Sequence, residues 1–334
     1  MSAPWHPGFP ALQSRFVAMT MLLVNRILAS IVVLFVVTLV VFIVTQAMPD
    51  DPAQIILGDM ARPEAVATLR EQLGLNHPYS VQYLDWAAHL LKGDFGTSYA
   101  THHPVSDLIV PALKNSLVLV GLTMVFLVPL AAVIGVSMAL WRDSKADYAA
   151  DYLLLCFSAL PDFAKGLFLV LLLSVGVWQV LPATAMIPPG DLALFYPRQI
   201  ALPVIVLVLS GLPYLTRLIR SSMIDILNME FVHMARLKGL SERRILFRHA
   251  LPNTAAPVIQ GVALCAALTL GGAVVIENLF RFPGLGALMT DAVSSRDLPL
   301  IQALIVTFAT CFMVINLVAE LLIARANPQL WGGQ

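Results

Sequence analysis

Long apolar runs alternate with short polar segments along this chain. The runs lie near residues 26–47, 113–141, 152–178, 199–219, 254–277 and 300–323. A helix of about 20 apolar residues crosses the roughly 30 Å hydrocarbon core of a bilayer. The pattern therefore predicts an all-α polytopic membrane protein with about six transmembrane helices. The second and third runs contain Pro129 and Pro161, which such helices tolerate when neighbours satisfy the freed carbonyl groups.

Composition supports lipid as the main solvent, because 59% of the residues are hydrophobic and only 12% are charged. Lys and Arg together number 20, as do Asp and Glu, so net charge does not indicate a nucleic-acid partner. Most of the basic residues fall in segments that share one side if the N-terminus is cytoplasmic, so we expect both termini in the cytoplasm. Cys156, Cys265 and Cys311 lie in apolar runs and are expected to be buried rather than paired or metal-bound.

These spans divide the chain into three parts. We expect a cytoplasmic N-terminal tail (1–25), a transmembrane domain (26–323) with an extracytoplasmic loop (48–112) and a cytoplasmic loop (220–253), and a cytoplasmic C-terminal tail (324–334). Met1–Thr20 shows no helical pattern, and it is either a disordered tail or sequence upstream of a start at Met19 or Met21. The first apolar run is longer than the roughly 7–15 residues of a cleaved signal peptide.

Outside these runs, loop 48–112 is long enough for short helices, which we expect at Glu64–Leu73, stopped by Gly74, and at Tyr79–Leu91. An apolar stripe on the second of these, suited to capping the bundle, comprises Val81, Leu84, Ala87 and Leu91. Small residues at four-residue spacing predict close helix packing in two spans. These are Ala131, Gly135 and Ala139, and Ala263, Ala267 and Gly271.

Loop 220–253 predicts two short helices around a turn. Phe231, Met234, Ala235 and Lys238 follow a helical i, i+3, i+4, i+7 pattern, and Gly239 suits the left-handed residue that ends a helix. Ser241 is positioned to cap the next helix, with Glu242 in its first turn, and Pro252 begins the following span.

This loop is also basic, since it carries Arg236, Lys238, Arg243, Arg244 and Arg248. It could bind anionic lipid headgroups, form a DNA-binding helix-turn-helix, or dock onto a soluble partner. A loop of about 30 residues that is tethered to lipid at both ends can hardly reach a DNA groove. We therefore expect no nucleic-acid partner.

Within this loop, Ala235, Gly239, Leu251 and Pro252 resemble the "EAA…G…LP" coupling motif of bacterial ATP-binding-cassette (ABC) importer permeases. The string ARLKGLSERRILFRHALPN is similar to the dipeptide/oligopeptide/nickel branch of that family, although His233-Met234 replace its Glu-Ala. Further similar segments occur in order along nearly the whole chain. They are Asp51-Pro52-Ala53, Gly93–Tyr99, Glu277-Asn278, Phe282–Gly286 and Arg296–Pro299.

The resemblance implies a type I-like permease subunit of a binding-protein-dependent importer in the bacterial inner membrane. Its partners would be a second homologous permease, cytoplasmic ATPase subunits, an extracytoplasmic solute-binding protein and membrane lipid. ATP and magnesium would bind the ATPases, so this chain would hold no cofactor or metal and catalyse nothing, in keeping with the absence of a GxxxxGK[ST] sequence. The residues expected to couple to the ATPases are Phe231, Ala235, Arg236, Lys238, Gly239, Leu240, Ser241, Leu251 and Pro252.

Two other classes of protein fit less well. A secondary transporter often shows two matched halves, but a long loop follows only the first span here. A membrane-embedded enzyme needs convergent polar residues, and none cluster across the spans. Within the importer class the substrate stays open: peptides, nickel chelates, glutathione and sugars are all consistent with this sequence.

Charged residues inside the spans are the candidate pathway groups. Asp162 and Lys165 lie in the third run at i, i+3 spacing, where they can pair. Either they line the pathway and read the charges of a zwitterionic solute, or they form a local structural pair. Glu277 ends the fifth span and could lie at an outer gate. Glu320, near Arg325, is expected to form a cap or an ion pair.

Overall fold

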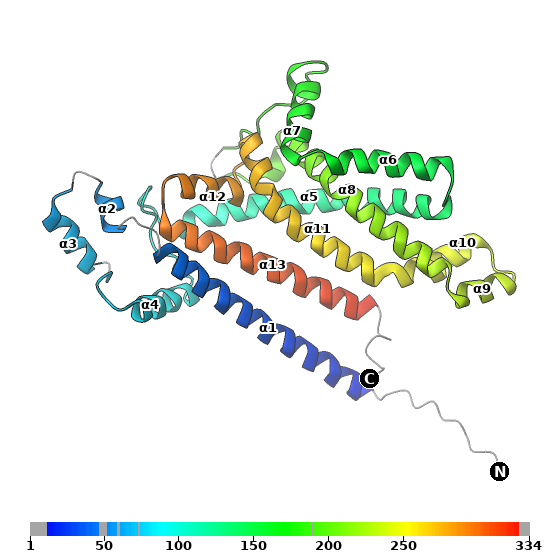
Figure 1. Ribbon diagram of the computed structural model, residues 1–334, viewed down its shortest axis with the longest axis horizontal. Coiled ribbons are helices and arrows are strands. Elements are labelled where there is room, and N and C mark those ends of the chain that lie inside the picture. Colours follow the sequence, from blue (N-terminus) through cyan, green and yellow to red (C-terminus); the bar gives the residue numbers. More distant parts are fainter. Residues whose placement is uncertain (1–11, 47–51, 59–60, 73, 189, 327–334) are drawn as a thin grey trace, which may run out of the picture.

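The computed structural model describes residues 12–46, 52–58, 61–72, 74–188 and 190–326, and helices dominate these residues (Figure 1). The α-helices are α1 (Leu12–Gln46), α2 (Pro52–Leu57), α3 (Pro63–Gln72), α4 (Tyr79–Leu91), α5 (Val105–Leu140), α6 (Lys145–Ala159), α7 (Asp162–Val170), α8 (Pro197–Leu227), α9 (Glu230–Leu237), α10 (Glu242–Ile245), α11 (Leu251–Phe280), α12 (Leu285–Ser294) and α13 (Leu298–Ala326). Within the described ranges, five helices are long and apolar enough to cross a membrane: α1, α5, α8, α11 and α13. The all-α polytopic prediction is confirmed.

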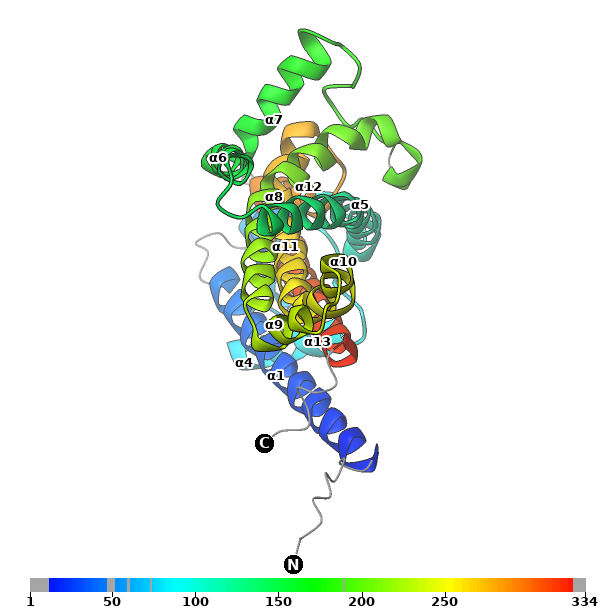
Figure 2. The ribbon, with the colours of Figure 1, turned by 90° about the vertical axis from the view of Figure 1, so that its right-hand side faces the viewer.

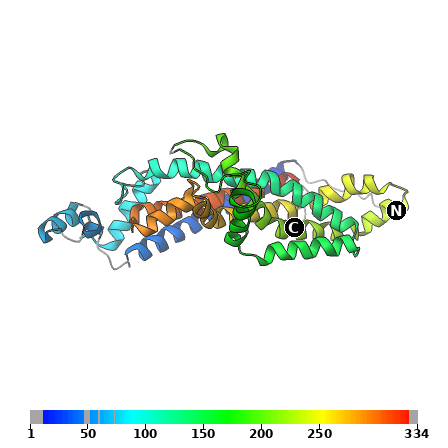
Figure 3. The same ribbon diagram turned by 90° about the horizontal axis from the view of Figure 1, so that it is seen from above.

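The long helices run side by side, with α2–α4 at one end of the bundle and α9–α10 at the other (Figures 1 and 3). We refer to these as the α4 end and the α9 end. Helix α8 lies at the centre of the bundle. In its most apolar 18-residue segment 61% of the residues are buried, whereas in that of α1 only 11% are. Helices α5, α11, α7 and α6 pack around α8, and α1 lies against α13.

The third predicted span, 152–178, is broken rather than continuous. Helices α6 and α7 meet at 98°, and α7 projects away from the bundle (Figure 2). The break lies at Leu160, whose ψ of 131° is extended. Proline disfavours the helical conformation of the residue before it, so Pro161 ends α6 and begins α7. The prediction of an uninterrupted helix through Pro161 was wrong, and the pair counts as the sixth span only if both halves are taken together.

Helix α1 begins at Leu12, so the expectation that residues 1–20 carry no helix was wrong from Leu12 onward. The apolar part of α1, Val24–Gln46, agrees with the run at 26–47. Residues 1–11 and 327–334 lie outside the described residues. Asp51 and Leu73, named in the sequence predictions, do so as well.

Small residues let α5 pack closely against α8. Ala131, Gly135 and Ala139 are all buried, and a Cβ on Gly135 would lie 2.8 Å from the Thr216 carbonyl oxygen. This confirms the first predicted small-residue face. On α11, Ala263 and Ala267 are buried, but a Cβ on Gly271 would meet open space.

Helix α4 contacts α1 through a face that sequence analysis did not select. The Tyr83 hydroxyl lies 3.1 Å from Thr38 Oγ1, and the rings of Tyr83 and Trp86 lie 5.4 and 6.0 Å from Phe42. Three of the four residues of the predicted stripe are exposed instead: Val81 at 39%, Leu84 at 65% and Leu91 at 89%. The capping-stripe prediction was wrong, because the large aromatic side chains of the adjacent face make the contact with α1.

The cysteines differ in environment. Cys265 is buried, Cys311 is partly buried and Cys156 is exposed, and all three are free thiols. The expectation of burial was therefore wrong for Cys156 on α6.

A buried carboxylate fastens the loop before α5 to the start of α13. Asp297 accepts hydrogen bonds from Ser98 Oγ, from the backbone N–H groups of Tyr99 (3.1 Å) and Ala100 (3.3 Å), and from that of Leu300 (3.3 Å). We call these residues the Asp297 cluster. The last bond is the usual N-cap bond of a helix, so one side chain caps α13 and holds loop 98–100.

Candidate functional site

The loop that joins α8 to α11, residues 228–250, folds as a small unit with its own apolar core. Val232 and Ala235 on α9 pack with Ile245 on α10, and all three are buried. Leu240 packs against them from the intervening turn. Ala235 and Leu240, both expected to couple to an ATPase, therefore hold the loop together rather than present a surface.

Four large apolar side chains of this unit are exposed instead of packing in its core. Phe231, Met234, Leu237 and Phe247 are exposed at 40%, 52%, 69% and 68%. Four basic residues of the same unit are also exposed: Lys238, Arg243, Arg244 and Arg248. We call this set the docking face. Of these, only Phe231 and Lys238 were among the predicted coupling residues, because the helical pattern of α9 fits two neighbouring faces equally well.

Two features fix the turn between α9 and α10. Gly239 has a φ of +76° and its N–H donates to the Arg236 carbonyl at 2.9 Å, which confirms the predicted left-handed residue. Arg236 Nε and Nη2 bind the Glu242 carboxylate at 2.8 and 3.2 Å, and this hydrogen bonding lowers the pKa of Glu242. Ser241 stands at the N-cap position of α10, but its side chain makes no capping hydrogen bond.

Substitution of Gly239 tests how far the turn depends on its conformation. A Cβ would meet no atom within 4 Å, so Gly239→Ala should cost only the strain of a positive φ, about 1 kcal/mol. Gly239→Pro forces a φ near −65° and removes the N–H, so we expect the unit to rearrange. Trypsin cleavage at Lys238 and Arg243 should then be several-fold faster than in wild type. Equal cleavage rates for Gly239→Pro and wild type would contradict this account.

Leu251 and Pro252 join this unit to the membrane-spanning part. Leu251 begins α11 and packs against the cluster formed by Ala139, Met223, Ile226 and Ala250. Pro252 lies in the first turn of α11, where its missing N–H is not needed. Leu251 therefore links this unit to α5 and α8 as well as to α11.

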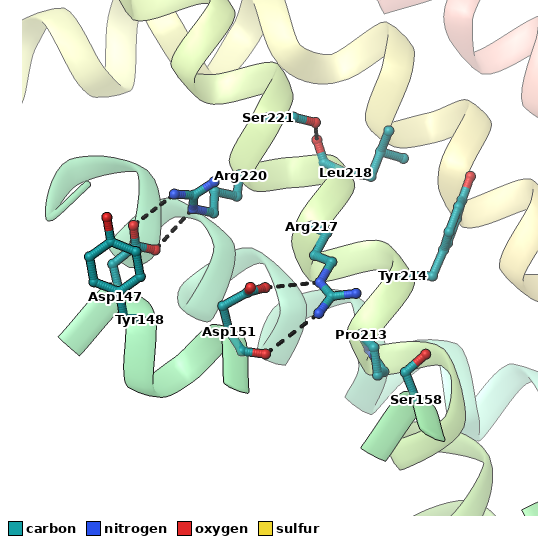
Figure 4. Close-up of a pocket in the computed structure, with 10 residues that line it drawn as sticks. All are labelled: Asp147, Tyr148, Asp151, Ser158, Pro213, Tyr214, Arg217, Leu218, Arg220 and Ser221. Atoms are coloured by element: carbon teal, nitrogen blue, oxygen red, sulfur yellow. Dashed lines mark hydrogen bonds and ion pairs between the residues drawn. The ribbon is translucent and has the colours of Figure 1, made fainter. Parts of the chain in front are cut away.

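A polar groove of about 690 Å³ lies between α6 and α8, toward the α9 end (Figure 4). Arg220 Nε and Nη2 bind the buried Asp147 carboxylate at 2.9 and 2.7 Å, and Arg217 Nε binds Asp151 at 3.0 Å. These pairs were not among the sequence predictions. The sequence does carry an indication of them, because Asp147 and Asp151 are four residues apart on α6 and the two arginines are three apart on α8.

The predicted pair in the third span is formed. Lys165 Nζ lies 2.7 Å from Asp162 Oδ1, and the Ser210 hydroxyl donates to the same oxygen at 2.7 Å. The Lys165 side chain is 6% exposed and the Asp162 side chain 41%. The carboxylate is therefore the accessible member of the pair, and the hypothesis that both charges read a solute stays a prediction.

Glu277 is fully buried. Its Oε1 accepts from the Ser116 hydroxyl at 2.7 Å, and its Oε2 accepts from Gly286 N–H at 2.6 Å and Ala287 N–H at 3.2 Å. The carboxylate thus caps α12 and joins it to α5 and α11. In this geometry Glu277 joins helices, and its candidate pathway role stays a prediction.

Glu320 forms an ion pair, as expected, but its partner is not Arg325. Its Oε1 lies 2.9 Å from Arg26 Nη1, so the ion pair joins α13 to α1 rather than forming with Arg325. Among the described residues, no group of three or more His, Cys, Asp or Glu side chains is arranged to hold a metal ion.

Comparisons with known proteins agree with this architecture. Residues 131–332 match the family model "Binding-protein-dependent transport system inner membrane component", and residues 19–120 match "Binding-prot-dependent transport system membrane comp, N-term". The chain is 35% identical over 307 residues to the glutathione transport system permease protein GsiC of Salmonella choleraesuis (strain SC-B67), covering 92% of this chain and 97% of that one. It is 34% identical over 313 residues to a putative peptide transport system permease protein of Brucella suis biovar 1 (strain 1330), covering 93% and 99%.

A solved structure shows the same fold at low sequence identity. An inward-facing conformation of the MetNI methionine ABC transporter superposes with a TM-score of 0.53 at 12% identity, covering 66% of this chain and 96% of that one. The family matches and the relatives together span nearly the whole sequence, and the helical architecture agrees with both. The chain therefore belongs to the binding-protein-dependent transport system inner membrane components, the multi-pass permease subunits of bacterial ABC importers.

Proposed function

We propose that this subunit carries peptides or a glutathione-like solute across the inner membrane, driven by ATPases that bind its docking face. The observation that carries the proposal is the two-sided geometry of the α9–α10 unit. Its core packs against Leu227 at the end of α8, and Leu251 continues it into α11, while its other apolar and basic side chains stay exposed. Such a unit can transmit a partner's movement to the spans as a rigid body.

The proposal fixes an orientation. The α9 end faces the cytoplasm, where family ATPases bind, and the α4 end meets the solute-binding protein. ATP and magnesium bind the ATPases, and this chain binds no cofactor of its own. The chain itself hydrolyses nothing; it supplies the pathway and the coupling surface.

We propose that a second, homologous permease covers the face formed by α6, α7 and the adjacent side of α8. Large apolar side chains are exposed there, including Tyr152, Leu153, Phe163 and Phe168. The same face carries the polar groove and the half-exposed Asp162. A face that combines apolar and charged groups suits neither lipid nor water alone, whereas a partner could enclose the charged groups in an aqueous path.

Leu237 offers a direct test of the docking face. Leu237→Glu places an unpaired charge where an apolar contact is expected, so ATPase subunits should co-purify at least about tenfold less well from the native host. The matched control is Leu91→Glu, a similarly exposed leucine at the α4 end, which should co-purify normally.

Two results would contradict this assignment. Normal ATPase recovery with Leu237→Glu would show that the ATPase binds elsewhere. A wild-type chain that purifies alone and transports solute on an ion gradient would instead identify a secondary transporter.

A further inference from the structure

A small cavity lies where α7 meets α8 and α11, close to the middle of both long helices. Its volume is about 220 Å³, and its polar lining comprises Asp162, Ser210, Tyr214 and Thr269. We call it the Asp162 pocket. The pocket has room for several water molecules, or for one end of a small peptide.

Only one oxygen of the Asp162 carboxylate has partners among the described residues. Lys165 and Ser210 both bind Oδ1, each at 2.7 Å, and the described residues make no hydrogen bond to Oδ2. Lys165 is buried, whereas Asp162 is 41% exposed and lines the pocket. The pair therefore presents an acceptor oxygen with residual negative charge, and no accessible cation.

At this depth, near the middle of α8 and α11, the Asp162 carboxylate is not expected to face lipid. An ionised group at mid-bilayer depth faces protein or water, because lipid cannot solvate it. The polar side of α8 continues from the pocket toward the α9 end through Ser210, Tyr214, Arg217 and Ser221, spaced at i, i+4, i+7 and i+11 on one helix face. The last three also line the polar groove (Figure 4). The pocket and the polar groove thus share Tyr214 and lie along the same polar side of α8.

The remaining lining is mixed and leaves the carboxylate as its one charged group. Leu207, Cys265 and Leu268 form apolar wall beside Tyr214 and Thr269, and Gly272 leaves part of the wall without a side chain. A primary ammonium group donates three hydrogen bonds, and hydroxyl and carboxylate oxygens accept them. Lys165 offsets part of the carboxylate charge, so binding would be weak enough to release the group again, as a transport pathway requires.

We infer that the Asp162 pocket is a subsite for the primary ammonium group of the transported solute, with Asp162 Oδ2 as its acceptor. The inference rests on the proposed function, since peptides and glutathione share this group. It assigns a solute contact to the permease itself, in addition to any selection by the solute-binding protein.

The test compares two variants that both abolish the ion pair. Lys165→Met keeps the carboxylate and the volume of the lysine stem, and Asp162→Asn with Lys165→Met removes both charges. In proteoliposomes containing the complete importer, ATP-driven uptake of tri-alanine by Lys165→Met should stay within about threefold of wild type. Uptake by the double variant should fall about tenfold further, the equivalent of one hydrogen bond to a charged group.

The comparison separates a solute contact from a structural pair. If the pair serves only to hold α7, both variants lose it alike, and equal uptake rates would overturn the inference. An equal loss for tri-alanine and N-acetyl-tri-alanine would also overturn it, because the acetylated probe has no ammonium group. Asp107→Asn, an exposed carboxylate on α5, is the matched control and should transport normally.

Failure of the proposed function would be recognised separately. In that case wild type would take up neither tri-alanine nor glutathione with ATP, or no ATPase would co-purify. Failure of the subsite alone leaves wild-type uptake and ATPase recovery intact, while the two variants behave alike.

Discussion

Glu277→Ala should destabilise the chain by roughly 3 kcal/mol or more, because it leaves several buried hydrogen-bond donors without an acceptor. The first three N–H groups of α12 have no partner within the helix and are bound from outside. Gly286 and Ala287 donate to Glu277, and Leu285 donates to Ser116 Oγ at 2.8 Å. Ser116 in turn donates to Glu277. Removing the carboxylate leaves two N–H groups and one hydroxyl without acceptors in a site closed to water.

Glu277→Gln separates hydrogen bonding from charge. The amide oxygen can accept from Gly286 and Ala287, and the amide nitrogen can turn to Ser116 Oγ as a donor. We therefore expect Gln to retain most of the stability, with a loss of about 1 kcal/mol. The measurement is the apparent midpoint of thermal unfolding of the purified chain in detergent, which should fall by several degrees for Ala and much less for Gln.

Exposed Glu64, in the first turn of α3, gives the matched control. Glu64→Ala should leave the midpoint almost unchanged, since it removes only a weak helix-dipole contact. Equal midpoints for Glu277→Ala and Glu277→Gln would show that charge, not hydrogen bonding, is what α12 requires. A midpoint for Glu277→Ala that matches wild type would show that α12 is held by other contacts.

The sequence was sufficient for features determined by local pattern. The apolar runs gave five of the long helices, the positive φ of Gly239 followed from its place after a helical repeat, and the Asp162–Lys165 pair followed from i, i+3 spacing. Each depends on residues close together in the chain. Local physics therefore specified them without knowledge of the packing.

The break at Pro161 could not be predicted, because Pro129 has the same chemistry and stays inside α5. The two prolines differ in their neighbours. Helix α5 packs against α8 along much of its length, whereas α6 and α7 lie at the edge of the bundle and part at 98°. Whether a helix continues through proline depends on whether neighbouring groups compensate, and this is a tertiary property.

Contacts between residues far apart in the sequence could not be predicted either. Ser116 and Glu277 are 161 residues apart, and Ser98 and Asp297 are 199 apart. The similar segments Gly93–Tyr99 and Arg296–Pro299 were recognised by resemblance, but only the structure shows that they bind each other. Sequence spacing could not reveal this, because both lie in separate polar stretches between spans.

Asp297→Ala should release the loop before α5 and uncap α13, with a combined cost of roughly 3 kcal/mol or more. The carboxylate binds donors from two separate segments. Ser98, Tyr99 and Ala100 come from the loop, and Leu300 is in the first turn of α13. The loss should be local, so amide hydrogen exchange should accelerate at Tyr99, Ala100 and Leu300. Asp85→Ala, an exposed carboxylate on α4, should leave these amides protected.

Asp297→Asn gives a more specific signature through Tyr99. Burial and, second, the Asp297 charge raise the pKa of Tyr99 to about 12. Neutralising Asp297 removes the second cause and leaves the first, so the pKa of Tyr99 should fall but stay above its ordinary value of 10.0. Ultraviolet titration, with Tyr99→Phe as the reference, measures this change.

The two Asp297 variants together decide what the cluster does. An Asn side chain still accepts from Leu300 through one oxygen, so α13 should stay capped, while Ala100 N–H loses its acceptor. Fast exchange at Ala100 with slow exchange at Leu300 in Asp297→Asn would therefore show that loop and helix are held by separate bonds to one side chain. Equal acceleration at both amides would contradict this, because it would mean that the loop and the start of α13 open as one unit.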